Sequence, residues 1–147
     1  MYRCFFIGHR DAPESIYPEL ARTVEQLIGQ GVTDFYVGHY GNFDRLAARV
    51  VIEAKQQRPE VRLTMLLPYH PAEREVVLPS GFDGSLYPPG MEKVPRRFAI
   101  SRANRWMVER CTHLIAYVTH PASNAGKVVE WGRTGSKKVI IELEKRK

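Results

Sequence analysis

Apolar residues in this chain follow two patterns that alternate along the sequence. One is a short continuous run, and the other is a stripe in which apolar residues recur every three or four positions. Short continuous runs are typical of buried strands, whereas the three-and-four repeat is typical of helices with one face on a core. The runs predict strands over residues 2–7, 33–37, 61–67, 113–119 and 138–143. The stripes predict helices over residues 15–30, 43–57, 95–110 and 124–134.

Polar and small residues mark where these helices begin and end. Gly31 is a stop signal after the first helix, and Asn42 is a natural N-cap for the second. Pro95 suits the first turn of the third helix. Ser123 or Asn124 is expected to cap the fourth.

Residues 68–95 depart from both patterns. They hold six prolines and three glycines, which interrupt any regular repeat. We expect a short helix around residues 71–77 and a long ordered loop over the rest. Loops of this length are uncommon in compact domains and often serve function, so this one is expected near the site.

The alternation of strands and helices predicts the fold class. It is typical of an α/β, Rossmann-like, doubly wound domain with a mostly parallel five-stranded sheet and helices on both faces. We expect residues 1–147 to form one such domain. Ligands of these sheets bind at the carboxyl ends of the strands, near the point where the strand order reverses.

Composition and charge narrow the class of protein. The chain has 147 residues, 44% of them apolar and 26% charged, which is typical of a soluble globular protein. No apolar run approaches the roughly 18–20 residues of a membrane helix, and a strand-like run follows Met1 at once, so we expect a cytoplasmic protein without a signal peptide. Cys4 and Cys111 are expected to be buried free thiols. The net charge of +6 favours an anionic partner, either a phosphorylated small molecule or a nucleic acid.

The first strand ends in Gly8, His9 and Arg10. Glycine lets a backbone approach a ligand closely, and an arginine can hold a phosphate through two parallel hydrogen bonds. The alternative is a purely structural turn, in which Arg10 pairs with an acid. Asp11 is expected to cap the next helix.

The second strand ends in the stretch GHYGNFD, residues 38–44, which places Gly38, Gly41, Asn42 and Asp44 at the start of a helix. A helix N-terminus offers free N–H groups to an anion. Asp44 could accept hydrogen bonds from ribose hydroxyls, or could simply offset the helix dipole. Phe43 falls on the core stripe.

Further candidates follow the other strands. Tyr69 comes directly after the third strand, and Arg102 and Asn104 flank the buried stripe of the third helix. In SNAGKVVE, residues 123–130, one helix face carries Ser123, Gly126, Lys127 and Glu130, which could equally be a solvated face. No acid or cysteine accompanies the histidines at ligand spacing, so no metal site is expected.

The ordered set IGHRD, YVGHYGNFDRLA, YPPGMEKVPRRFAI, RANRWMVERCTHLIAYV and AGKVVEWGRTGSKKVIIEL resembles the SLOG superfamily. This superfamily joins the Smf/DNA-processing proteins and the Lonely-Guy enzymes, and the resemblance is strongest to its compact bacterial, YpsA-like branch. It covers nearly the whole chain, and it implies a Rossmann-like domain that binds nucleotides or ligands derived from them.

The resemblance also implies site residues. Gly8 and Arg10 match the first-strand motif, and Gly38, Gly41 and Asp44 match the second, with one residue more between Gly41 and Asp44 than in the DNA-processing members. The compact branch has an Arg-x-Asn-x-Trp-Met signature, which is matched by Arg102, Asn104, Trp106 and Met107.

Gly126 and Glu130 match the last fixed points of the Lonely-Guy pattern Gly-Gly-x-Gly-Thr-x-x-Glu. Lys127 replaces the threonine, and Ser123 and Asn124 replace the double glycine. These departures weaken the case for the Lonely-Guy reaction, which hydrolyses the base–ribose bond of a nucleotide, and leave phosphate binding in place.

Three functions are therefore compared. The first is binding or sensing of a nucleotide-derived ligand, for example one similar to ADP-ribose, without turnover. The second is a nucleotide N-glycosidase (phosphoribohydrolase) in which Glu130 is catalytic. The third is binding of single-stranded nucleic acid. No cofactor is expected, and a homodimer is left open.

Overall fold

A computed structural model describes residues 1–143 of the chain, so the last four residues of the predicted domain lie outside the described residues. The strands are β1 (Arg3–Gly8), β2 (Asp34–Val37), β3 (Arg62–Leu66), β4 (Gly84–Leu86), β5 (His113–Tyr117) and β6 (Val139–Glu142). The α-helices are α1 (Tyr17–Gly29), α2 (Asn42–Gln57), α3 (Ala99–Arg110) and α4 (Asn124–Thr134). Short 3-10 turns cover Glu14–Ile16, Met91–Lys93 and Arg96–Phe98.

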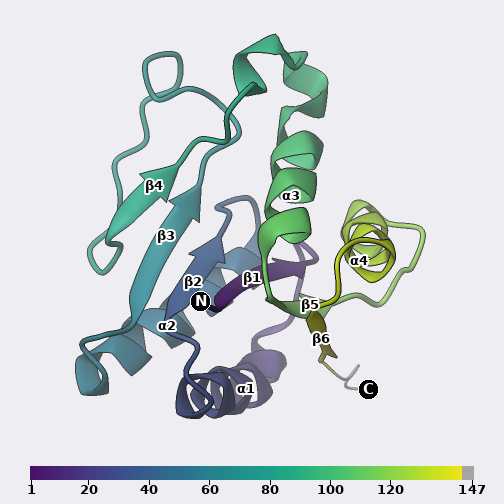
Figure 1. Cartoon of the computed structure of the whole chain (residues 1–147). Coiled ribbons are helices and arrows are strands. Elements are labelled where there is room, and N and C mark those ends of the chain that lie inside the picture. Colours follow the sequence, from purple (N-terminus) through teal and green to yellow (C-terminus); the bar gives the residue numbers. More distant parts are fainter. Residues whose placement is uncertain (144–147) are drawn as a thin grey trace.

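The strands form one parallel sheet in the order β4-β3-β2-β1-β5-β6, which runs from left to right in Figure 1. The chain moves outward from β1 to β4 and then crosses to the other side of β1 to form β5. The strand order therefore reverses between β1 and β5, which is where such sheets bind ligands. The predicted α/β, Rossmann-like fold is confirmed, with six strands instead of five.

Helices cover both faces of the sheet. Cys4 and Phe6 of β1 pack in the core under α1 and α2, while Phe5 and Ile7 pack in the core under α3 and α4. Every residue of β5 is buried, as expected for a strand whose two faces are both covered. Within residues 1–143, no helix has both the length and the apolar character needed to cross a bilayer.

Strand β4 arises inside the predicted loop and pairs with β3 at the edge of the sheet. Asp83, directly before it, accepts hydrogen bonds from the Leu63 amide at 2.8 Å and from Lys55 Nζ at 2.5 Å. At the end of β4, the Leu86 carbonyl accepts from the Leu67 amide at 2.8 Å. These partners come from distant parts of the chain, and a run of three residues shows no periodicity of its own.

The helix expected over residues 71–77 is wrong. The amides of Glu73 and Arg74 both donate to the His70 carbonyl, which makes one turn, and His70 Nδ1 accepts from the Ala72 amide. The chain then continues without regular structure through Val76 and Val77. β-branched residues of this kind lose rotamer freedom in a helix.

Three expected helix starts also differ. Gly41, not Asn42, is the N-cap of α2, and the Asn42 side chain instead donates to the Ala12 carbonyl at 2.6 Å. Helix α3 begins at Ala99, because a 3-10 turn intervenes after Pro95. Asp11 caps no helix, since the N-terminal turn before α1 begins after Pro13 without a side-chain cap.

Candidate functional site

A cleft of about 210 Å³ lies at the point where the strand order reverses. Its walls come from the exits of β1, β2 and β3, from the first turn of α2, from one side of α3 and from the first residues of α4. Eight predicted residues lie in this lining: Gly8, His9, Arg10, Gly38, Asp44, Asn104, Ser123 and Asn124. The folding rule for parallel sheets thus brings residues from four separate segments to one place.

The exit of β1 docks onto the start of α2. The Asn42 amide donates to the Arg10 carbonyl at 2.9 Å, and the Phe43 amide donates to the His9 carbonyl at 3.4 Å. The first two N–H groups of α2, those of Asn42 and Phe43, are therefore used inside the protein and are not free for an anion. Gly41 and Asn42 do not line the cleft; they hold the exit of β1 against the start of α2.

Two glycines are required by packing at this junction. A Cβ on Gly8 would lie 2.4 Å from the Phe43 ring, which is buried as predicted. Gly41 has φ +145°, and a Cβ there would lie 2.6 Å from the Cα of Arg10. Both positions let the exit of β1 lie directly against α2, which fixes where Arg10 enters the cleft.

Asp44 is the carboxylate that lines the cleft. Its Oδ2 accepts from the Tyr40 amide at 3.1 Å, and Gly38 leaves room for it, because a Cβ on Gly38 would lie 2.9 Å from that oxygen. Burial raises the pKa of Asp44 to about 6, against the opposing effects of the Tyr40 amide and the Arg10 charge. The cleft therefore contains an acid whose charge changes close to neutral pH.

His9 joins the exits of β1 and β5. Its Nε2 accepts from the Thr119 amide at 2.7 Å, so Nε2 carries no proton and the neutral ring is the form that fits. Burial and the neighbouring His120 lower the pKa of His9, against the opposing charge of Asp11. His9 thus positions the two strand exits relative to each other at the mouth of the cleft.

The start of α4 faces the cleft. Ser123 caps the helix, with its Oγ accepting from the Gly126 amide at 3.1 Å. Within residues 1–143, no acceptor meets the backbone N–H groups of Asn124 and Ala125, and both residues line the cleft. Gly126 itself lies behind them, where a Cβ would come within 2.1 Å of the Pro121 carbonyl oxygen. Its role is close packing of the helix start.

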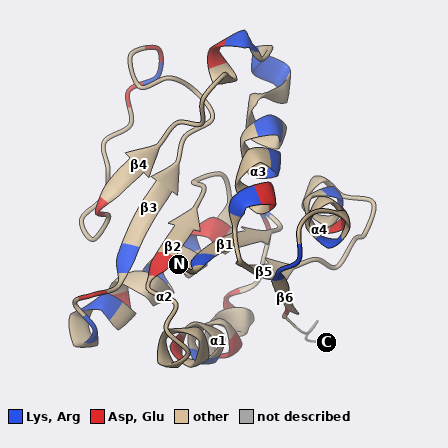
Figure 2. Cartoon of the chain, viewed as in Figure 1, with Lys and Arg blue, Asp and Glu red and all other residues tan. Residues whose placement is uncertain are grey.

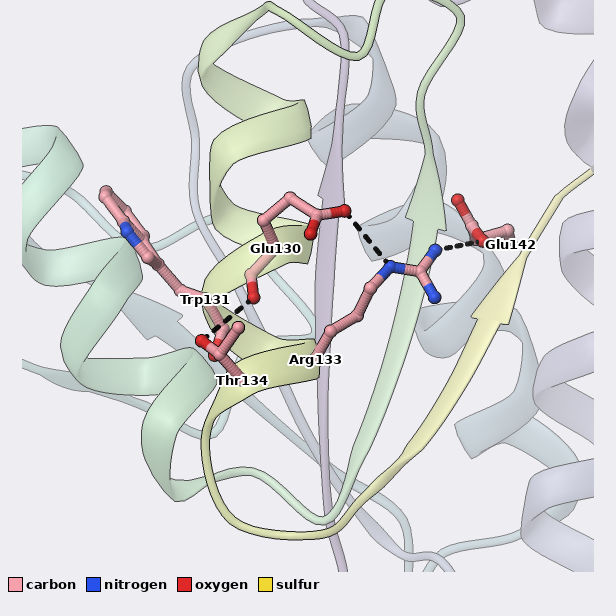
Figure 3. Close-up of polar contacts among 5 residues, drawn as sticks. All are labelled: Glu130, Trp131, Arg133, Thr134 and Glu142. Carbon is pink, nitrogen blue, oxygen red and sulfur yellow. Dashed lines mark hydrogen bonds and ion pairs between the residues drawn. The ribbon is translucent and has the colours of Figure 1, made fainter.

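Other predicted residues lie outside this cleft. Tyr69 lines a neighbouring cavity, and Arg102 is exposed on α3. Glu130 is also exposed, and Figure 3 shows Arg133 between the carboxylates of Glu130 and Glu142, at 3.3 Å and 2.5 Å. The Glu130 side chain therefore contributes to an ion-pair network on the surface of α4, outside the cleft lining.

The sequence did not mark two residues of the lining as candidates for binding. Tyr40 lies between the two glycines of the second motif, and Ile100 forms an apolar wall on α3 together with Ala103 of the buried stripe. Ile100 precedes Asn104 by four positions, which places both on one side of α3 and is the signal that could have found Ile100. The four histidines of the strand exits form no cluster with other metal-ligating residues in the described part of the chain.

Arginines follow one another along α3 and its preceding turn (Figure 2). Three of them lie over aromatic rings: Arg97 over Phe98 at 4.8 Å, Arg105 over Trp131 at 5.0 Å, and Arg110 over Trp106 at 4.2 Å. We call the surface formed by Arg102 and Arg105 of α3 and the neighbouring Trp131 of α4 the basic face. Cationic and aromatic groups together are typical of surfaces that bind single-stranded nucleic acids.

No protein-family model and no curated protein matches this chain. Solved structures do. DNA processing protein A (DprA) from Streptococcus pneumoniae is similar with a TM-score of 0.66 and 15% identity, over 99% of this chain and 51% of that one. DNA processing protein A from Helicobacter pylori, whose structure is described for its single-stranded DNA binding mode, is similar with a TM-score of 0.61 and 15% identity, over 99% and 66%.

The chain has the fold of these DNA processing proteins, which is the fold that the resemblance to the SLOG superfamily implied. At 15% identity the likeness shows the fold alone. The chain spans between about half and two thirds of the length of these neighbours.

Proposed function

We propose that the domain binds a phosphate-bearing, nucleotide-type ligand in the cleft between β1 and β5. The observation that carries this proposal is that the N–H groups of Asn124 and Ala125, at the start of α4, have no acceptor among residues 1–143 and lie in a cleft that Arg10 also lines. A helix N-terminus attracts anions through its N–H groups and its dipole, and an arginine adds charge-assisted hydrogen bonds.

The other polar side chains of the cleft can form hydrogen bonds with the hydroxyl groups of a ribose. Asp44 is an acceptor once ionised, and Asn104 is both a donor and an acceptor. They enter from α2 and α3, opposite each other across the sheet, since the two helices cover different faces. Hydroxyl groups between them would be held from both sides, which favours a ribose phosphate over inorganic phosphate.

The hydrolase alternative has less support from the geometry. Glu130, its intended catalytic acid, is paired with Arg133 and does not line the cleft. The carboxyl that does line it is Asp44. We therefore propose binding as the primary function.

Thermal unfolding with added nucleotides tests this proposal. A ligand at 100 times its Kd adds about 2.7 kcal/mol to the free energy of unfolding, which corresponds to a rise of roughly 5–10 °C in melting temperature for a domain of this size. We expect such a shift with at least one ribonucleotide, and its loss in Arg10→Ala. Arg22→Ala is the matched control, because Arg22 is exposed on α1, which contributes no residue to the cleft lining. No shift with any nucleotide, or an equal loss in both variants, contradicts the proposal.

A second candidate function is binding of single-stranded nucleic acid on the basic face. It is favoured by the Arg105–Trp131 pair there and by the single-stranded DNA that the Helicobacter pylori neighbour binds. Phosphate contacts would make this binding strongly dependent on salt, and aromatic rings would stack on bases.

Charge reversal separates this candidate from general attraction to a basic protein. We expect Arg102→Glu with Arg105→Glu to weaken binding of a single-stranded oligonucleotide at least about tenfold at about 50 mM salt. Arg22→Glu with Arg45→Glu makes the same change of net charge on α1 and α2. Fluorescence anisotropy measures both. Equal losses in the two double variants, or no binding at low salt, would exclude a specific basic face.

A further inference from the structure

A second cavity, of about 240 Å³, adjoins the cleft and shares Tyr40 and Pro68 with it. It lies between the exits of β2 and β3 and the segment that follows the His70 turn. Leu67 and Pro68 are buried and make its base. The other lining residues that matter here are His39, Tyr69 and Arg74.

Flat groups surround this cavity. The rings of His39 and Tyr40 pack with their centroids 4.1 Å apart, and the Arg74 guanidinium lies 4.1 Å over the Tyr69 ring. The Tyr69 hydroxyl donates to the Arg96 carbonyl at 3.4 Å, which fixes the ring. Aromatic faces and a stacked guanidinium favour a planar, electron-rich ring as the occupant.

One polar atom of this cavity's lining residues has no partner. The Nδ1 atom of His39 is buried, and among the described residues no hydrogen bond reaches it. Protein atoms cover this nitrogen, so a ligand in the cavity does not reach it. His39 contributes its flat ring, packed against Tyr40, to the lining of the cavity.

The two cavities complement each other in size. Neither reaches the roughly 300 Å³ at which ligand pockets begin, but together they exceed it. Tyr40 stands at their border. We infer that the second cavity receives the nucleobase of a nucleotide whose phosphate lies at Arg10 and the start of α4. This inference rests on the proposed function and adds the base as the group that determines specificity.

Isothermal titration with ribose 5-phosphate and with the four ribonucleoside 5′-monophosphates tests the inference. The wild type should bind at least one nucleotide about tenfold more tightly than ribose 5-phosphate, since stacking of one base is worth roughly that much or more. Tyr69→Ala removes a stacking ring, and Val76→Trp fills the cavity with a larger side chain. Each variant should abolish this preference and leave the affinity for ribose 5-phosphate unchanged. Tyr2→Ala is the matched control, because Tyr2 is exposed at the opposite end of β1.

The outcomes separate the two proposals. If the wild type binds neither ligand, the proposed function fails and the inference fails with it. If it binds ribose 5-phosphate and the nucleotides equally, or if both cavity variants keep the preference while remaining folded by circular dichroism, only the inference fails. If a short single-stranded oligonucleotide displaces the bound nucleotide, and Tyr69→Ala weakens this displacement, the base comes from a nucleic acid. If only mononucleotides displace it, the ligand is a free nucleotide.

Discussion

Single residues of the cleft hold their positions at a cost to stability. Asp44 is half-buried at the cleft, and its carboxylate receives one backbone hydrogen bond, from Tyr40. Desolvation favours the neutral acid, so the native protein keeps the Asp44 proton to a higher pH than the unfolded chain does. Sites that bind ligands commonly retain such unfavourable groups because the ligand needs them.

Asp44→Asn should therefore stabilise the free protein in a pH-dependent way. The pKa of Asp44 rises from 3.8 to about 6 on folding, so its contribution to stability is complete below about pH 4 and is lost as pH rises through about 6. Asparagine keeps the acceptor for the Tyr40 amide and does not titrate. We expect the variant to gain up to about 3 kcal/mol over wild type at pH 7.5 and much less at pH 4. Urea unfolding at both values measures this, and a gain that does not vary with pH would contradict the burial of this carboxyl.

At the scale of elements, the start of α4 is held in place by close backbone packing. The glycine at position 126 allows the Pro121 carbonyl to contact the first turn of the helix. Since the free N–H groups of this turn are the proposed phosphate site, the position of the whole helix relative to β1 and β5 determines binding. The His9 bond to Thr119 holds the same loop from its other end.

Gly126→Ala should destabilise the protein although alanine is the better helix former. Its Cβ would lie 2.1 Å from a backbone oxygen, so the helix start must move. We expect a loss of about 1–3 kcal/mol, together with weaker ligand binding. Gly29→Ala at the end of α1 is the control, because nothing lies within 4 Å of its Cβ, and it should be neutral or gain up to about 1 kcal/mol. Thermal unfolding of the two variants measures this difference. A change of melting temperature in the same direction in both would contradict a packing role for Gly126.

At the scale of the whole molecule, the second cavity depends on how residues 67–83 are held between β3 and β4. Lys55 of α2 binds both the Asp83 carboxylate and the Gly81 carbonyl, at 2.5 Å and 2.7 Å. Burial would raise the pKa of Asp83, but Lys55 and the Leu63 amide outweigh it and lower that pKa. This network ties the edge strand to the body of the domain.

Asp83→Ala should release this edge without unfolding the domain. Loss of charge-assisted hydrogen bonds to Lys55 and Leu63 should cost about 1–3 kcal/mol at pH 7. Amide hydrogen exchange should quicken in β4 and the preceding loop and stay unchanged in β1 and β5. Because the native pKa of Asp83 is lowered, its contribution is present above about pH 4 and disappears as the carboxyl protonates in acid. If amide hydrogen exchange instead quickens equally in all strands of the sheet, Asp83 stabilises the whole domain and not only its edge.

Much of this arrangement could be predicted from the sequence, because it depends on local periodicity. The apolar runs and stripes determined five strands, four helices and a parallel sheet, and the topology rule then placed Gly8, Arg10, Gly38 and Asn124 at one edge. Hydrophobic patterns report which face of an element is buried, and parallel strands share a direction, so these conclusions needed no coordinates.

Only the tertiary structure decided which polar groups are free to bind. The amides of Asn42 and Phe43 at the start of α2 donate to the carbonyls of Arg10 and His9, whereas within residues 1–143 the amides of Asn124 and Ala125 at the start of α4 meet no acceptor. The two helix starts look equally suitable in sequence. The same holds for Asp44, which is half-buried at the cleft, and Glu130, which is paired with Arg133 on the surface. Hydrogen-bond partners, desolvation and the second cavity all depend on residues brought together from distant segments, and no local pattern records those distances.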